Sequence, residues 1–300
     1  MTVGQSTGDG TSPFRCVLDI KAKLGECPQW NADEQALYWV DIEAPTLNRF
    51  DPAAGVNIAM PMPEAIGSFA FRKGGGFVVA LRSGVWFANA HGRLTRKVAD
   101  APFDPAHHRF NDGRCDRQGR FFAGSMNERR DASTGALWRL DTDLSFHEVL
   151  GGMTVSNGLA WSPDGRTMYH ADTPTRTIRT FDYDVASGTP SGAREFARFP
   201  GETDRPDGGT VDAQGCYWTA FFRGGKVLRL SPQGRVLAEH PVPAMCPTMC
   251  AFGGPGLSTL YVTTARTQRD EAELARLPLS GGLFAMDVDV PGLPEPSFGG

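Results

Sequence analysis

Short apolar runs alternate with tight polar turns along almost the whole chain. The clearest example is Ser156–Trp161, an apolar run with a polar Asn157 near its start, which is followed by the turn residues Pro163-Asp164-Gly165. Proline fixes φ at one turn position and glycine accepts a positive φ at another. Residues 168–170 after this turn are again strand-like in composition. The pattern therefore predicts a strand, a tight turn and a second strand.

The same layout recurs along the chain. Its turns centre on residues 33, 74, 118, 164, 214 and 254, at intervals of 41, 44, 46, 50 and 40 residues. A repeat of about 40–50 residues built from strands is typical of β-propeller blades. A second series of hairpins alternates with the first, with turns such as Asp51-Pro52 and Ser231-Pro232. Together the two series predict an all-β protein, a six-bladed β-propeller with four-stranded blades around a central channel.

The ends of the chain complete this picture. We expect residues 14–300 to form a single propeller domain, and the small, polar residues 1–13 to form a disordered tail. The ring of blades must close, and residues 14–20 have the composition of a strand. Pairing of this strand with the C-terminal region, residues 260–297, would remove two open sheet edges. Residues 270–276 predict a short helix between strands.

The composition of the chain limits which binding partners and which cellular location we expect. A formal charge of −4, a pI near 5.9 and the lack of a Lys/Arg run argue against nucleic acid or an anionic membrane as a partner. Residues 1–12 show no basic stretch followed by an apolar core, so we expect no signal peptide there, and no stretch approaches the roughly 20 apolar residues of a membrane helix. We expect a monomer, because a closed ring has no exposed sheet edge. The cysteines lack C-x-x-C spacing, which favours reduced, buried thiols and a cytoplasmic location; they are Cys16, Cys27, Cys115, Cys216, Cys246 and Cys250.

Polar side chains recur at one register, seven positions before each turn centre. The six residues there are Glu26, Gly67, Asn111, Asn157, Asp207 and Pro247. Because the innermost strand of each blade lines the channel, four oxygen-bearing side chains are expected in one ring at one mouth of the channel. Such hard donors suit Ca²⁺, Mg²⁺ or Mn²⁺ and tolerate Fe²⁺ or Zn²⁺. Two carboxylates would neutralise a divalent ion, and without the ion they would repel each other.

Each of these residues also has a simpler interpretation. Asn157-Gly158 and Asp207-Gly208 are common turn-forming pairs, and Glu26 could be a solvated loop residue. Taken singly, the turn interpretation is the stronger one. The shared register favours a metal or polar site for the set, because independent turn residues need not fall at the same offset.

Two neighbouring segments add further candidates. Side chains alternate in a strand, so Arg109 is expected on the same face as Asn111, where its guanidinium could bind ligand hydroxyls or a carboxylate. A structural ion pair between blades is the alternative for Arg109. The charged loop 127–131 is expected to be solvated, unless Asn127 or Glu128 folds over the channel mouth. The sequence contains no Gly-rich phosphate loop, G-x-S-x-G elbow or HExxH motif.

From about residue 16 onward the chain resembles the senescence marker protein / regucalcin / gluconolactonase family. The motifs that carry the resemblance are LGECPQW (24–30), RFNDG (109–113), FAGSM (122–126), SNGL (156–159), PDG (206–208), YVTTAR (261–266) and GGLF (281–284). The ordered set is specific. It implies a six-bladed propeller that holds one divalent metal ion on its axis and, in many members, hydrolyses sugar lactones.

The resemblance also implies roles for individual residues. Glu26, Asn157 and Asp207 would be metal ligands, with Asp207 also the catalytic acid/base, and Arg109 and Asn111 would bind substrate. Animal relatives use an acidic residue in the loop after FAGSM. Here the aligned position is Arg129, with Glu128 one residue earlier, so Glu128 is the candidate for that contact. The identity of the ion stays open among Ca, Zn, Mn, Mg and Fe(II).

The expected activity is metal-dependent hydrolysis of an aldonolactone to the aldonic acid in sugar catabolism, with Asp207 assisting the attacking water. Two other functions stay open. One is a phosphotriesterase- or arylesterase-like propeller hydrolase. The other is a non-catalytic metal-binding platform, because fold alone does not define function.

Overall fold

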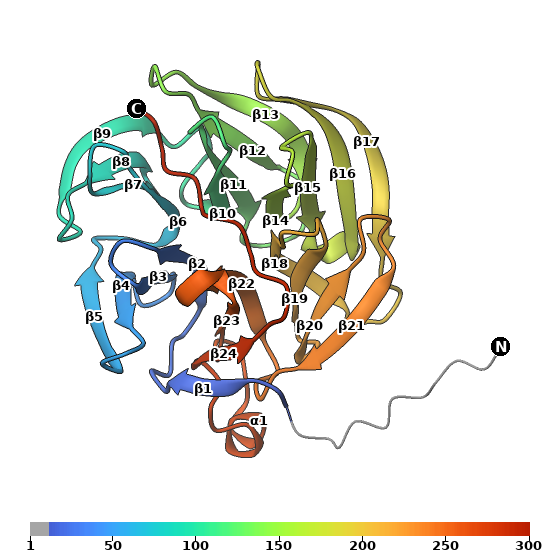
Figure 1. Ribbon diagram of the computed structural model, residues 1–300. Coiled ribbons are helices and arrows are strands. Elements are labelled where there is room, and N and C mark those ends of the chain that lie inside the picture. The colour runs from blue at the N-terminus through green and yellow to red at the C-terminus, as the bar shows by residue number, and fades with distance from the viewer. Residues whose placement is uncertain (1–11) are drawn as a thin grey trace.

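The computed structural model describes residues 12–300, which form a ring of six antiparallel four-stranded sheets (Figure 1). The predicted six-bladed β-propeller with four-stranded blades is confirmed. The tail predicted for residues 1–13 lies, as far as residue 11, outside the described residues. Among residues 12–300, no helix has the length and apolar character needed to span a lipid bilayer.

The blades follow one another along the chain, each running from an inner to an outer strand. Blades 1 and 2 comprise β2 (Gly25–Asn31), β3 (Ala36–Asp41), β4 (Thr46–Asp51) and β5 (Val56–Pro61), then β6 (Ile66–Phe71), β7 (Phe77–Leu81), β8 (Gly84–Ala88) and β9 (Leu94–Asp100). Blades 3 and 4 comprise β10 (His108–Cys115), β11 (Phe121–Asn127), β12 (Gly135–Leu140) and β13 (Phe146–Met153), then β14 (Ser156–Trp161), β15 (Thr167–Asp172), β16 (Thr177–Asp184) and β17 (Thr189–Arg198). Blade 5 comprises β18 (Arg205–Val211), β19 (Tyr217–Phe222), β20 (Lys226–Leu230) and β21 (Val236–Pro241).

Blade 6 closes the ring with strands from both ends of the chain. It comprises β22 (Pro247–Gly253), β23 (Thr259–Thr264), β24 (Leu283–Asp287) and β1 (Arg15–Leu18), the last pairing antiparallel with β24. This pairing of the N-terminal strand with the C-terminal region was predicted. The predicted helix is α1 (Glu271–Arg276), which is capped by the side chain of Asp270. Two 3₁₀ turns, η1 (Thr173–Thr175) and η2 (Pro255–Leu257), complete the regular structure.

The core lies between neighbouring blades. The inner strands are almost entirely buried, whereas outer strands such as β5 and β9 expose much of their length. All six cysteines are free thiols, as predicted, and five are buried, with Cys16 half-buried. Packed aromatic and aliphatic side chains fill the spaces between blades, for example around Phe69 and Phe77 between blades 1 and 2. This packing holds the inner strands in a fixed arrangement around the axis.

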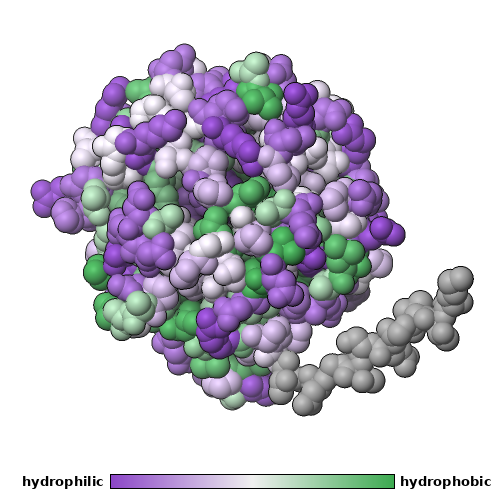
Figure 2. Space-filling view, in the orientation of Figure 1, coloured by the Kyte–Doolittle hydropathy of each residue, from purple (hydrophilic) through white to green (hydrophobic). Residues whose placement is uncertain are grey.

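The last residues, 289–300, form a strap across one face of the ring (red in Figure 1). Phe298 is fully buried, and its backbone N–H donates to the carbonyl oxygen of Phe71 in blade 2 (2.7 Å). Glu295 forms an ion pair with Arg114 of β10 (Oε1 to Nη1, 3.3 Å), with both side chains nearly buried. Figure 2 shows this face, where hydrophilic residues cover most of the rim and apolar residues gather in small patches. The strap therefore covers the end of the channel at which the inner strands finish.

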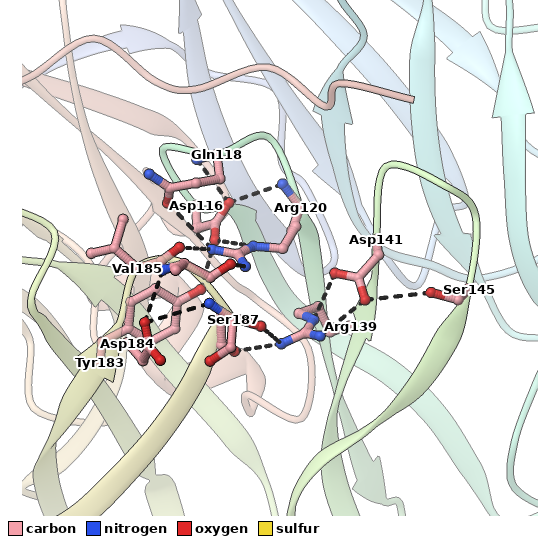
Figure 3. Close-up of polar contacts among 12 residues, drawn as sticks. Asp116, Gln118, Arg120, Arg139, Asp141, Ser145, Tyr183, Asp184, Val185 and Ser187 are labelled. Carbon is pink, nitrogen blue, oxygen red and sulfur yellow. Dashed lines mark hydrogen bonds and ion pairs between the residues drawn. The ribbon is translucent and has the colours of Figure 1, made fainter.

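A buried polar network joins blades 3 and 4 (Figure 3). Asp116 accepts hydrogen bonds from Arg120 Nε (2.6 Å) and from the hydroxyl of Tyr183 in blade 4 (2.6 Å). Arg120 also donates to the carbonyl oxygen of Val185 (2.6 Å), in the turn after β16. Arg139, on β12, donates to two further carbonyl groups of the same turn. These contacts fix one blade against the next through groups that are satisfied inside the protein.

His170 predicts an acid-sensitive step in stability. The ring is buried in β15, with Nε2 2.8 Å from Ser156 Oγ, and burial together with the positive charge of Arg179 lowers the pKa of His170 to about 4. The folded protein thus binds fewer protons than the unfolded chain between the two pKa values, so stability falls as the pH drops through this window. We expect a cost of about 2 kcal/mol at pH 5 relative to neutral pH.

The comparison is with His170→Gln. Between pH 7.5 and pH 5, the melting temperature of the variant should fall by roughly 4 °C less than that of the wild type. Equal decreases in the two proteins would show that His170 does not carry this step.

Candidate functional site

The end of the channel away from the strap opens into a cavity of about 490 Å³. This volume is within the range of small-molecule sites, roughly 300–1,000 Å³. Five of the six predicted site residues line the cavity, namely Glu26, Arg109, Asn111, Asn157 and Asp207. They come from the inner strands of blades 1, 3, 4 and 5. The structure therefore brings together residues that are spread over almost two hundred positions of the sequence.

The inner strands share a local irregularity at the site. In every blade the pairing between the first and second strands shifts at the site register or one residue before it, for example at Glu26 in blade 1 and at Asn157 in blade 4. Such bulges redirect side chains and are common beside active sites. Gly158, inside one bulge, has a φ of +64°, and a Cβ atom there would lie 2.5 Å from the Tyr217 hydroxyl oxygen. The bulge after Asn157 therefore requires glycine.

A chain of hydrogen bonds runs around one side of the cavity. Arg109 Nη1 donates to Asn111 Oδ1 (2.7 Å), and Asn111 Nδ2 donates to Asn157 Oδ1 (2.7 Å). Asn157 Nδ2 donates to Thr173 Oγ1 (2.8 Å), whose hydroxyl donates to the carbonyl oxygen of Pro206 (2.8 Å). The chain links blades 3, 4 and 5 and orients both amides. Asn157 Oδ1 retains a second lone pair, because an amide oxygen has two.

Two buried carboxylates face the same cavity. Among residues 12–300, neither Glu26 nor Asp207 forms an ion pair with a basic side chain. Burial raises the pKa of Glu26 well above its ordinary value, and the negative charges of Asp207 and Asp112 raise it further. Burial, with Asp112, likewise raises the pKa of Asp207, against the opposing effect of Arg130 and Arg109. Two negative charges are therefore costly here unless positive charge compensates them.

The donor set fits a divalent cation. Glu26 and Asp207 supply carboxylate oxygens and Asn157 an amide oxygen, all lining one cavity. A doubly charged ion would balance both carboxylates and remove the repulsion that raises their pKa values. No three His, Cys, Asp or Glu side chains of residues 12–300 are grouped to hold a metal ion, so such a site would depend on an amide ligand.

Arg109 and Glu128 meet beside the cavity. Arg109 is buried and lines it, with Nε 3.7 Å from Glu128 Oε1. Glu128 does not line the cavity, and accepts two hydrogen bonds from Arg82 of blade 2 (2.7 and 2.9 Å). The hydrogen bonds from Arg82 lower the pKa of Glu128. Arg109 therefore lies in the cavity, and its ion pair with Glu128 is within blade 3, because Glu128 follows β11 of the same blade. The contact between blades is instead the one from Arg82 to Glu128.

Sequence reasoning missed three arginines that line the cavity, Arg130, Arg176 and Arg205. A signal existed for Arg205, which stands two positions before Asp207 as Arg109 stands two positions before Asn111. Strand alternation therefore puts it on the face of the site residue. Arg130 and Arg176 lie outside the strands, where no periodicity indicates the direction of a side chain.

Comparison with known proteins identifies one family. Residues 24–266 match the family described as SMP-30/Gluconolactonase/LRE-like region, which confirms the resemblance. A 6-deoxy-6-sulfogluconolactonase of Pseudomonas putida is 49% identical over 289 residues, covering 96% of this chain and 99% of the relative. A pentonolactonase of Haloferax volcanii is 35% identical over 285 residues, covering 93% of this chain and 96% of the relative.

A comparison with solved structures points to the same family. The crystal structure of regucalcin from Agrobacterium tumefaciens, described as a calcium-binding protein, superposes with a TM-score of 0.90 at 27% identity, covering 95% of this chain and 96% of the other. The family match extends over most of the chain, and the relatives align over nearly all of it. The chain therefore belongs to the SMP-30/gluconolactonase/LRE-like family.

Proposed function

We propose that this protein is a sugar lactonase, which hydrolyses the cyclic ester of an aldonolactone to the aldonic acid with the help of one divalent cation. The observation that carries the proposal is the pair of buried carboxylates, Glu26 and Asp207, that face one cavity without a basic partner among the described residues. The names of the P. putida and H. volcanii relatives, both lactonases of sugar acids, support the substrate class. A role in sugar catabolism, a cytoplasmic location and a monomeric state stay predictions.

Glu26, Asn157 and Asp207 would hold the cation through their side-chain oxygens. When bound, a divalent cation supplies a positive charge that polarises the ester carbonyl and stabilises negative charge on its oxygen. The donor oxygens do not distinguish strongly among divalent ions, so the identity of the ion is a matter for experiment.

Asp207 carries the proton chemistry in this proposal. As water attacks the carbonyl carbon, the Asp207 carboxylate takes its proton, a new C–O bond forms, and the bond to the ring oxygen then breaks. The proton passes from Asp207 to the departing ring oxygen, which becomes a hydroxyl of the open aldonic acid. The place of Asp207 in the cavity, beside Glu26 and Asn157, supports this role.

Arg109 and Asn111 hold the substrate. Both amide hydrogens of Asn111 are already used, by the carbonyl oxygen of Ser156 (3.0 Å) and by Asn157 Oδ1 (2.7 Å). Its Oδ1 accepts from Arg109 and has one lone pair left for a sugar hydroxyl. Asn111 therefore orients Asn157 and accepts from the substrate, whereas Arg109 donates to it. Positioning of this kind contributes to rate because the reacting groups are already aligned.

Removal of the cation tests the proposal. Protein treated with a chelator is expected to lose lactonase activity and to recover it when a single metal ion is added back. Hydrolysis is followed by acid release from D-gluconolactone, a pentonolactone and 6-deoxy-6-sulfogluconolactone, after subtraction of the uncatalysed rate. Aryl esters and phosphotriesters serve as comparison substrates.

Thermal melting gives a second measurement of the same prediction. The metal-free protein should melt at a lower temperature than the metal-loaded protein. An ion at a hundred times its Kd raises the free energy of unfolding by about 2.7 kcal/mol, and this stabilisation is lost when the ion is removed. Full activity in metal-free protein would reject the catalytic role of the ion. Hydrolysis of phosphotriesters or aryl esters but of no lactone would reject the lactonase assignment.

A further inference from the structure

One wall of the cavity carries positive charge that the protein does not neutralise. Arg130 follows β11 in blade 3, Arg176 lies between β15 and β16 in blade 4, and Arg205 begins β18 in blade 5, and all three line the cavity. Among residues 12–300 none of them forms an ion pair with Asp or Glu, and Arg130 and Arg205 make no side-chain hydrogen bond. Only Arg176 has such partners, two backbone carbonyl oxygens at 3.3 Å.

The arginines also oppose one another. All three guanidinium groups line the same cavity, so their like charges repel one another. By contrast, the buried guanidinium of Arg120 in the network of Figure 3 is matched to a carboxylate and to carbonyl groups. Of the three cavity arginines, Arg130 is exposed, and Arg176 and Arg205 are half-buried. A cluster of like charges without partners costs stability. Because this cluster lines a cavity, an anionic ligand bound there would neutralise its charge and offset that cost.

The acidic lining residues do not cancel this charge. Glu26 and Asp207 are assigned to the cation in the proposed function. Glu43 belongs to the opposite wall, in blade 1, and accepts a hydrogen bond from Thr267 Oγ1 (2.6 Å). Glu202 is the one acidic residue near the arginines among the described lining residues, and it is exposed. The wall formed by blades 3 to 5 therefore keeps a net positive charge.

We propose that Arg130 and Arg205, assisted by Arg176, form an anion subsite, and that the substrate is an aldonolactone with an acidic oxyanion group, such as a sulfonate or phosphate, on its terminal carbon. This inference rests on the proposed function. Guanidinium groups present paired N–H donors that match the oxygens of such groups, and the pairing is strengthened by charge. A neutral sugar hydroxyl would leave the positive wall unmatched.

The spacing agrees with this arrangement. Arg205 and Asp207 are two residues apart on β18, which separates their Cα atoms by about 6.6 Å along a strand. In a six-membered lactone of a hexonic acid, the terminal carbon is attached beside the ring oxygen, on the far side of that oxygen from the carbonyl. A lactone with its carbonyl at the carboxylates would therefore have its terminal group on the side of the ring oxygen that faces away from them, and the arginines line the same cavity.

The test compares lactones that differ only at the terminal carbon. Values of kcat/KM are measured in metal-loaded protein for D-glucono-1,5-lactone and for its 6-sulfo and 6-phospho analogues, corrected for spontaneous hydrolysis. The wild type is expected to prefer at least one charged lactone over the neutral one by tenfold or more, and the two analogues show whether a sulfonate or a phosphate fits better. Arg205→Gln and Arg130→Gln should each reduce this preference about tenfold, mainly through KM.

A matched control removes a positive charge elsewhere. Arg194→Gln deletes an exposed arginine on β17 that pairs with Asp182, and the preference should not change. Equal rates for charged and neutral lactones in the wild type would overturn the subsite. So would a loss in Arg205→Gln that is equal for all lactones, because the arginine would then act on the reacting ester or on the new carboxylate.

A binding measurement tests the anion subsite independently of lactonase activity. Calorimetry with 6-phosphogluconate and gluconate uses the open acids and requires no turnover. Tenfold tighter binding of the phosphorylated acid, lost in Arg205→Gln, supports the subsite even if no lactone is hydrolysed. Equal affinity for the two acids contradicts it even if lactonase activity is present.

Discussion

Asp207→Asn is expected to reduce kcat/KM for the best lactone about a thousandfold, because general base catalysis commonly contributes 10²–10⁴ in rate. Asparagine has nearly the same size and keeps an oxygen for the cation, but it cannot take a proton from water. The variant should remain folded. Since burial and Asp112 raise the pKa of Asp207, the ionised carboxylate destabilises the metal-free protein at neutral pH. The variant should therefore melt no lower than the wild type in the presence of a chelator.

Steady-state kinetics with saturating metal ion and melting curves with chelator provide the two measurements. Asp182→Asn is the matched control, because Asp182 is an exposed carboxylate on the outer part of blade 4, and its kcat/KM should equal that of the wild type. A loss of less than tenfold in Asp207→Asn would remove Asp207 from the role of general base and leave it as a ligand.

Asp116→Ala is expected to destabilise the fold by about 3 kcal/mol or more. The carboxylate of Asp116 is 1% exposed and accepts hydrogen bonds from Arg120 and Tyr183 (Figure 3). Its removal leaves a buried guanidinium and a buried hydroxyl without their partner, and the guanidinium keeps its charge. The melting temperature should decrease by at least about 5 °C.

The control for this variant is Asp182→Ala. The Asp182 side chain is 64% exposed, and its ion pair with Arg194 lies at the surface, where such pairs contribute about 0–1 kcal/mol. Its melting temperature should stay close to that of the wild type. Similar decreases in the two variants would mean that the contacts between blades 3 and 4 do not depend on the buried network.

The blade count was accessible from sequence because turns have strong local signals. Glycine and proline at turns such as Pro163-Asp164-Gly165 mark strand ends whatever the tertiary structure, and their spacing repeats. Once six repeats are assigned to one ring, symmetry converts a register in the sequence into a position in space. For this reason Glu26, Asn111, Asn157 and Asp207 could be expected together, and the structure does place all four in one cavity.

Other parts of the site depend on features that sequence periodicity does not contain. Asp112 follows Asn111, so simple alternation would direct it away from the channel. The bulge between Phe110 and Gly113 breaks that alternation, and the negative charge of Asp112 raises the pKa of both Glu26 and Asp207. A bulge depends on pairing with the next strand, so it could not be read from one segment alone.

The positions of the loop side chains could not be predicted from the sequence either. Glu128 and Arg130 are neighbours in one charged loop, yet Glu128 binds Arg82 while Arg130 lines the cavity. The difference depends on the position of Arg82 in the adjacent blade, which local composition does not encode. The chain therefore predicts where the ring of oxygens lies better than it predicts the basic residues around it.

The strap over the far end of the channel has a kinetic consequence. Glu295 and Arg114 occupy that end, so in the proposed function the lactone would enter and the acid would leave by the same opening, past the arginines. Ring opening creates a carboxylate that the lactone lacked, and the product is attracted to this wall more strongly than the compound that entered. In the proposed reaction we therefore expect the departure of the acid, rather than cleavage of the ester, to limit the rate of repeated turnovers.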